Sequence, residues 1–183
     1  MTPDHQPTVA APGSPGPAGS DPPPRGVAGM RMSHFVVRDA IVPTLTATTR
    51  DEVIRELVRS LHAAGQFLNT DLEDVIRAVL RREQLGSTGI GRGIAIPHSR
   101  HAAVSQLVGT IGLSKADGRI PFDSIDGEPV DIVVLLISPQ DRPGDHLRAL
   151  ENVVQTMRDD EFVRSLRACR TRDEVWALIT GGR

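Results

Sequence analysis

Three stretches of the chain begin with the pattern Thr-x-x-Glu, starting at Thr49, Thr70 and Thr171. In this pattern the threonine and glutamate side chains satisfy free amides of a first helical turn. Behind each threonine, apolar residues recur at the three- and four-residue spacing of one helix face. We therefore expect helices behind all three starts, the first ending at Gly65 and the second before Gly86.

The middle of the chain has the pattern of β-strands. Residues 94–96 form a short apolar stretch that stops at Pro97, and residues 106–113 have the composition of a strand. Residues 131–138 contain the sequence Ile-Val-Val-Leu-Leu-Ile, which is typical of a strand covered by helices on both faces. Two further helices are expected from Pro143 and from Asp160. The pattern predicts an α/β fold, with a mixed parallel and antiparallel sheet flanked by helices on both faces.

The first 32 residues lack this patterning. They hold eight of the 14 prolines, interleaved with glycine, alanine and serine. Such a segment buries too little apolar surface to offset the entropy of ordering. We predict a disordered tail over residues 1–32, whose removal leaves the melting temperature nearly unchanged, and a single folded domain over residues 33–183.

Charge and cysteine content narrow the class of protein. The formal net charge is −2 with mixed signs, so there is no basic field for nucleic acid or anionic lipid. The longest unbroken apolar run, residues 132–137, is far too short to span a bilayer. The single cysteine excludes an intramolecular disulfide and a cysteine-rich metal cluster. We expect a cytoplasmic protein that is not inserted in a membrane, does not bind nucleic acid and needs no cofactor.

Candidate chemistry is densest between residues 81 and 100, where four glycines fall within eight residues. Successive amides in such a loop can bind an anion, and the candidate phosphate-binding residues are Gly86, Ser87, Thr88 and Gly89. Three arginines, Arg82, Arg92 and Arg100, are candidates for charge-assisted bonds to phosphate oxygens. Spacing alone favours the plainer interpretation, a flexible connection between a helix and a strand. A Walker A loop and a dinucleotide fingerprint are both excluded, because the only lysine lies far away and the run does not lie between a strand and a helix.

His98 follows Pro97 at the end of this run. A free imidazole has a pKa near 6.5, so a neutral ring nitrogen is available as a nucleophile at pH 7. His146 lies at the start of a predicted helix, where the helix dipole favours an anion. Taken alone, His98 also fits a solvated loop side chain, and His146 fits the flank of an amphipathic helix.

A zinc site is the other chemical hypothesis. His98 and His101 have the spacing His-x-x-His, but zinc needs one or two more ligands. Neither a His-Glu-x-x-His motif nor a cysteine pair supports this hypothesis.

The segment from Gly86 to His98 closely resembles the active-site motif of type-2 IIA components of the phosphotransferase system, the fructose/mannitol class and its nitrogen-regulatory branch. The resemblance extends over roughly residues 36–180 and includes Arg82-Glu83, the segment 120–126 and His146-Leu147. It departs from the family after the histidine, where Ser99-Arg100 stands in place of the family's Gly-Lys or Ala-Lys. Arginine keeps the charge of lysine but is not equivalent to it.

The resemblance implies a phosphohistidine at His98, with His146 stabilising the phosphoryl group and Arg82 close to it. It implies a mixed sheet with helices on both sides. It also implies a phosphoryl carrier that is loaded by the histidine phosphocarrier protein and passes the group to a IIB component for sugar uptake. The alternative is a regulatory, nitrogen-type IIA protein whose phosphorylation controls the binding of partners. The motif does not distinguish between these two roles.

Overall fold

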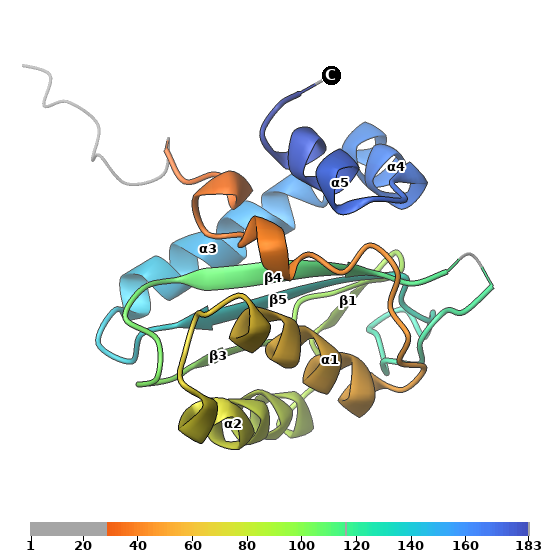
Figure 1. Ribbon diagram of the computed structural model, residues 1–183. Coiled ribbons are helices and arrows are strands. Elements are labelled where there is room, and N and C mark those ends of the chain that lie inside the picture. The colour runs from red at the N-terminus through yellow and green to blue at the C-terminus, as the bar shows by residue number, and fades with distance from the viewer. Residues whose placement is uncertain (1–28, 116, 183) are drawn as a thin grey trace, which may run out of the picture.

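A computed structural model describes residues 29–115 and 117–182, and Figure 1 shows their arrangement. The helices of the described residues are α1 Arg50–Ala63, α2 Leu72–Gln84, α3 Pro143–Thr156, α4 Asp160–Ala168 and α5 Arg172–Ile179, with short 3-10 helices η1 Met32–His34, η2 Arg38–Ala40 and η3 Asn69–Asp71. The strands are β1 Gly89–Gly91, β2 Ile94–Ala95, β3 His98–Arg100, β4 Val108–Leu113 and β5 Ile132–Ser138. None of the described helices is long and apolar enough to cross a membrane.

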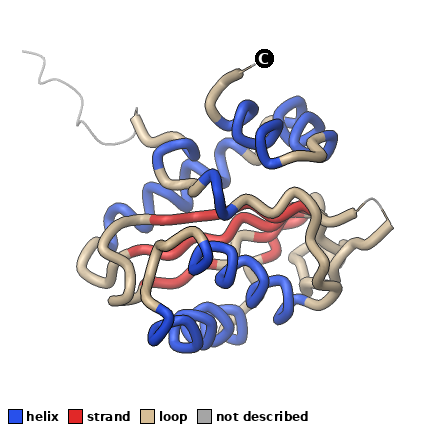
Figure 2. The backbone as a smooth tube through the Cα atoms, viewed as in Figure 1, coloured by secondary structure: helices blue, strands red, loops and turns tan. Residues whose placement is uncertain are grey.

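The sheet is built around β5. On one edge β5 pairs antiparallel with β4, and along its other edge it pairs parallel with β2 and then with β3. The pairs Ile94 with Ile132 and His98 with Leu136 have the same offset, so β2 and β3 form one line interrupted at Pro97. The predicted mixed sheet is confirmed, and the apolar stretch before Pro97 continues beyond it as a strand. Figure 2 shows the strands side by side between the helices.

Successive residues of β5 belong to opposite faces of the sheet. Val133, Leu135 and Ile137 pack in the core shared with α1 and α2, whereas the alternate residues pack in the core shared with α3, α4 and α5. All seven residues of β5 are buried. Figure 1 shows α1 and α2 on one side of the sheet and α3, α4 and α5 on the other. The prediction of a strand covered on both faces is confirmed, and the period-two alternation of side chains explains why both faces are apolar.

Two of the three predicted helix starts are confirmed. The Thr49 side chain accepts the Glu52 amide at the start of α1, and Thr171 with Glu174 forms a complete capping box at α5. The start at Thr70 is wrong, because this residue lies in η3 and α2 begins two residues later without a side-chain cap. Here the chain makes a tight turn before the helix.

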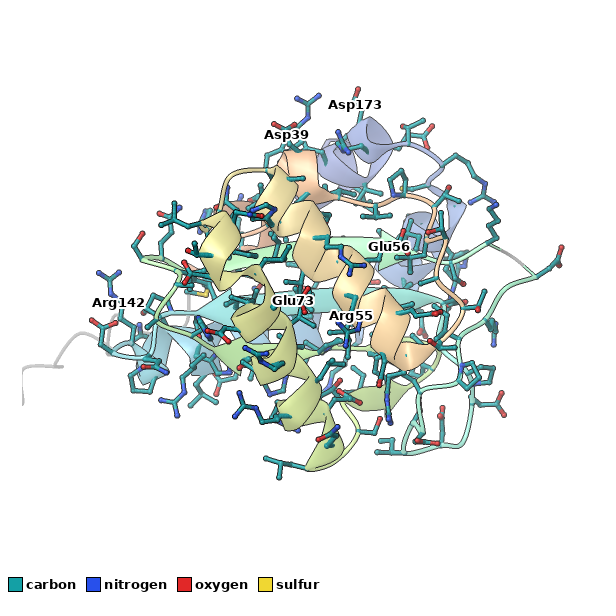
Figure 3. The ribbon with its side chains drawn as sticks, turned by 60° about the horizontal axis from the view of Figure 1, so that its bottom comes forward. Asp39, Arg55, Glu56, Glu73, Arg142 and Asp173 are labelled. Atoms are coloured by element: carbon teal, nitrogen blue, oxygen red, sulfur yellow. The ribbon has the colours of Figure 1, made fainter. Side chains whose placement is uncertain are left out.

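The paired helices α1 and α2 are joined mainly by their apolar stripes. Across their outer surface, Arg55 Nη1 lies 3.7 Å from Glu73 Oε2, and both residues are labelled in Figure 3. Both side chains are well exposed, so this ion pair adds little to stability. Burial of the apolar stripes therefore holds the two helices together.

The domain begins earlier than predicted. Met32, placed in the tail by its sequence, is buried in the core beside α3 and α5, and Asn152 Nδ2 donates to the Met30 carbonyl at 2.7 Å. The boundary at residue 32 is therefore wrong, because the two methionines supply apolar surface that the composition of the segment concealed. Residues 1–28 of the predicted tail lie outside the described residues.

Two truncations test this boundary. A variant lacking residues 1–32 is expected to be about 2 kcal/mol less stable than one lacking residues 1–28, because it loses the burial of Met32 and the hydrogen bond to Met30. Urea unfolding of the two variants measures the difference. Equal midpoints and equal slopes would contradict the packing of Met30 and Met32.

The glycine-rich run is a β-hairpin and not a flexible connection. β1 and β2 pair antiparallel, and the turn between them holds Gly91, Arg92 and Gly93 at positive φ angles of 90°, 60° and 78°. The glycines adopt these angles without the steric cost that a side chain imposes. The hairpin extends the sheet beside β5 and leads the chain into β3, where the candidate nucleophile lies.

Candidate functional site

The sheet orients His98. Its register partner Leu136 faces α3, and aligned residues of neighbouring strands point to the same face, so the half-buried His98 ring also faces α3. Its Nδ1 lies 2.7 Å from the Ile96 carbonyl oxygen. A carbonyl only accepts, so Nδ1 carries the proton and Nε2 keeps its lone pair. His98 is therefore a strand residue with Nε2 as the available nucleophile.

His146 approaches from the opposite side of this site. It lies in the first turn of α3, and its ring centroid is 5.3 Å from that of His98, with the two planes tilted by 54°. Both rings line a cavity of about 790 Å³, together with Arg82, Ser99, Arg100, Gln140, Pro143 and Leu150. The structure thus brings together three residues predicted from the sequence, His98, His146 and Arg82.

Burial and positive charge keep both imidazoles neutral at pH 7. Burial lowers the pKa of His98, and Arg82 lowers it further, against the opposing effects of the Ile96 carbonyl and Glu83. The pKa of His146 falls to about 4 through burial, followed by the charges of His98, Arg100 and Arg82. A neutral His98 is the nucleophilic form, and the nearby arginines supply a positive field for an anionic group.

Arg82 is fixed at the end of α2 beside this cavity. Its Nη1 donates to the Gly86 carbonyl at 3.0 Å. A guanidinium has five N–H donors in a planar fork, so this contact orients the group and leaves further donors for a ligand. Arg100 is an exposed residue of β3 that lines the same cavity, and its register partner on β5 is Ser138.

The predicted phosphate-binding residues do not form an anion nest. Thr88 donates its amide to Glu83 Oε1 at 2.9 Å and its hydroxyl to Glu83 Oε2 at 2.6 Å. Ser87 donates its hydroxyl to the Phe122 carbonyl and accepts the Gly89 amide at 3.1 Å, while the Gly86 amide donates to the Glu83 carbonyl. The predicted role of Gly86, Ser87, Thr88 and Gly89 is corrected, because their donors bond within the protein. Thr88 joins the hairpin to α2, and Ser87 joins it to Phe122.

Arg92 is likewise at a different place from the one predicted. It lies in the hairpin turn, where its guanidinium donates to the Met157 carbonyl and pairs with Asp160 at the start of α4. It does not line the cavity beside His98. Of the three arginines predicted to bind phosphate, only Arg82 and Arg100 lie there.

The zinc hypothesis finds no ligand set in the part of the chain that the structure describes. There, no three histidine, cysteine, aspartate or glutamate side chains gather as a group that could hold a metal ion. His101 lines a neighbouring cavity of about 530 Å³, and its Nδ1 accepts the Ala103 amide at 3.0 Å. His98 and His101 therefore serve different local structures.

Two residues important to this region were given no role of their own from the sequence. Glu83 is only 3% exposed and joins α2 to the hairpin, and the fully buried Ser138 contacts His146. Glu83 had a signal in the sequence, because it continues the apolar stripe of α2 one turn after Val79. Ser138 had no such signal, because its contact with His146 depends on how α3 packs against the sheet.

Comparisons with known proteins place the chain in a family. Residues 34–181 match the family described as Phosphoenolpyruvate-dependent sugar phosphotransferase system, EIIA 2. The chain is 31% identical over 150 residues to a nitrogen regulatory protein of Bradyrhizobium diazoefficiens, a match that covers 82% of this chain and 95% of that protein. It is 32% identical over 152 residues to the phosphotransferase-system 2-O-alpha-mannosyl-D-glycerate-specific EIIABC component of Escherichia coli, covering 82% of this chain but 22% of that protein.

A solved structure extends the likeness to three dimensions. The crystal structure of nitrogen regulatory protein IIA-Ntr from Neisseria meningitidis superposes with a TM-score of 0.73 at 29% identity, covering 81% of this chain and 98% of that one. With the family match over most of its length, the chain belongs to the type-2 EIIA components of the phosphoenolpyruvate-dependent sugar phosphotransferase system.

Proposed function

We propose that the chain carries a phosphoryl group on Nε2 of His98, accepting it from the histidine phosphocarrier protein and passing it to a protein acceptor. One observation carries this proposal: the unprotonated Nε2 of His98 opens onto a cavity that also holds His146, Arg82 and Arg100. Membership in a family of phosphotransfer components supports it.

The transfer step follows from this arrangement. Nε2 of His98 attacks the phosphorus of the donor phosphohistidine in line, so that a P–N bond forms on His98 as the P–N bond of the donor breaks and its electron pair returns to the donor imidazole. The negative charge of the transferred group faces Arg82 and Arg100. Nδ1 of His98 keeps its proton throughout and donates it in the hydrogen bond to the Ile96 carbonyl. This hydrogen bond holds the ring in one orientation during transfer.

Two kinds of acceptor have support. The likeness to nitrogen regulatory proteins supports a regulatory output, in which phosphorylation changes the charge of the surface around His98 and thereby the choice of partner. The similar identity to the mannosylglycerate-specific component supports passage of the group to a IIB component. The two outputs use the same phosphohistidine, so the loading step is common to both.

A phosphorylation assay tests the loading step. The wild-type protein, incubated with phosphoenolpyruvate, enzyme I and the phosphocarrier of the same genome, is expected to take up one acid-labile phosphate, and His98→Ala none. His101→Ala is the matched control, because it removes the nearest histidine along the chain from outside the His98 cavity, and it should keep full stoichiometry. Label on His98→Ala, or its loss from His101→Ala, would contradict the assignment.

The acceptor is identified from the loaded protein. Purified phosphorylated protein is mixed with each IIB domain encoded in the same genome. Rapid movement of the label to a IIB domain would establish the transport output. Retention of the label in every mixture would favour the regulatory output.

A further inference from the structure

We propose that Ser138 is a positioning residue for phosphoryl transfer, whose hydroxyl holds His146 in the tautomer that presents an Nε2–H donor to the phosphoryl group. This inference rests on the proposed function of His98. It assigns a role to a buried side chain that neither accepts the phosphoryl group nor lines the cavity.

The place of Ser138 in the sheet brings it to His146. Ser138 is the last residue of β5 and lies on the same face as Ile132, Val134 and Leu136, which pack toward α3. It is fully buried, and its Oγ lies 2.5 Å from His146 Nδ1. Its carbonyl accepts the His101 amide at 2.8 Å, so its backbone is fixed as well. The hydroxyl therefore stands on the strand that is paired along both of its edges.

The direction of this hydrogen bond determines which nitrogen of His146 carries the proton. Among the described residues, the Ser138 hydroxyl has no second hydrogen-bond partner. If Nδ1 of His146 donated, the buried hydroxyl proton would be left without an acceptor, which is costly. If the hydroxyl donates, its proton is satisfied and His146 carries its own proton on Nε2. Only the second arrangement gives the buried hydroxyl proton an acceptor.

The two histidines then have opposite chemical roles. His98 has its proton on Nδ1, held by the Ile96 carbonyl, and offers the lone pair of Nε2. His146 has its lone pair on Nδ1, held by Ser138, and offers the N–H of Nε2. A nucleophile and a neutral hydrogen-bond donor therefore lie in rings whose centroids are 5.3 Å apart. A lone pair of His146 in this position would repel the phosphoryl oxygens.

The experiment compares three serine variants in two measurements. Nitrogen NMR of histidine-labelled, unphosphorylated protein reports the tautomer of His146, and rapid-quench kinetics report the rate of phosphoryl transfer to His98. In Ser138→Ala we expect His146 to become a mixture of tautomers and the transfer rate to fall about tenfold, with His98 still phosphorylated to full stoichiometry. Ser138→Thr keeps the hydroxyl and is expected to restore both properties.

Ser124→Ala is the matched control, because it also removes a buried serine hydroxyl, one that has no hydrogen-bond partner in the described part of the chain. It should change neither the tautomer nor the rate. A wild-type His146 protonated on Nδ1, or a Ser138→Ala protein with an unchanged tautomer, would overturn the proposed role of Ser138. A wild-type protein that takes up no phosphate would instead contradict the proposed function, and the tautomer measurement remains independent of that result.

Discussion

Replacing His146 with alanine is expected to slow phosphoryl transfer to His98 about 100-fold, the usual cost of removing one donor that stabilises a developing anion. The ring lies across the cavity from the nucleophile and supplies a neutral N–H donor next to Arg82 and Arg100. The nucleophile and its tautomer do not depend on His146, because Ile96 holds Nδ1 of His98. The variant should therefore still reach full phosphorylation in a long incubation. Rapid-quench measurement of the transfer rate, beside the end-point stoichiometry, separates the two effects.

His146→Gln provides the control for this prediction. Its amide carries N–H donors at a similar reach, so it is expected to recover part of the lost rate. Leu147→Ala changes the next residue of α3, which is exposed to solvent, and should leave the intrinsic rate at saturating donor nearly unchanged. Transfer by His146→Ala at the wild-type rate would remove His146 from the mechanism.

Replacing Glu83 with alanine is expected to lower the free energy of unfolding by about 3 kcal/mol. The Glu83 carboxyl group accepts both the amide and the hydroxyl of Thr88 in a buried position. Alanine leaves two buried donors without acceptors and frees the hairpin from the end of α2. Because Arg82 is the adjacent residue of this helix, the transfer rate should fall together with stability. Urea unfolding measures the stability and the rapid-quench assay measures the rate.

Glu73→Ala is the matched control, since it makes the same substitution on the same helix at an exposed position. Glu73 makes only an exposed ion pair with Arg55, so its replacement should change the free energy of unfolding by less than about 1 kcal/mol. In Glu83→Ala the Thr88 hydroxyl is left without an acceptor, and the double variant Glu83→Ala with Thr88→Val removes that hydroxyl. The double variant should therefore lose less stability than the sum of the losses in the two single variants. A loss below about 1 kcal/mol for Glu83→Ala alone would contradict the view that the hydrogen bonds between Glu83 and Thr88 hold the hairpin against α2.

The parts of the fold with a strong repeating pattern were predictable. Six of the seven residues of β5 are apolar, and a strand that lies between two helix layers buries both of its faces. The helix starts at Thr49 and Thr171 were predictable because their caps are local interactions. The start at Thr70 failed because the same letters occur in a 3-10 turn, which the pattern does not distinguish.

The candidate site was predictable only in part. His98 and His146 were identified from the sequence, but their proximity depends on the parallel pairing of β3 with β5 and on the placement of α3, which are long-range features. The glycine-rich run was misjudged because its composition indicates free amides, whereas in the fold Glu83 accepts the Thr88 amide and Ser87 accepts the Gly89 amide. Arg92 was misplaced for a related reason. It lies in the turn of the hairpin, next to Met157, and this turn is not part of the cavity that His98 lines.

The most direct test of the central claim is the identity of the phosphorylated atom. Nitrogen and phosphorus NMR of the loaded protein, labelled at its histidines, distinguishes the two ring nitrogens and assigns the residue. The structure predicts a single phosphohistidine, on Nε2 of His98, because Nδ1 is held by the Ile96 carbonyl. Phosphate on Nδ1 of His98, or on any other residue, would contradict the account.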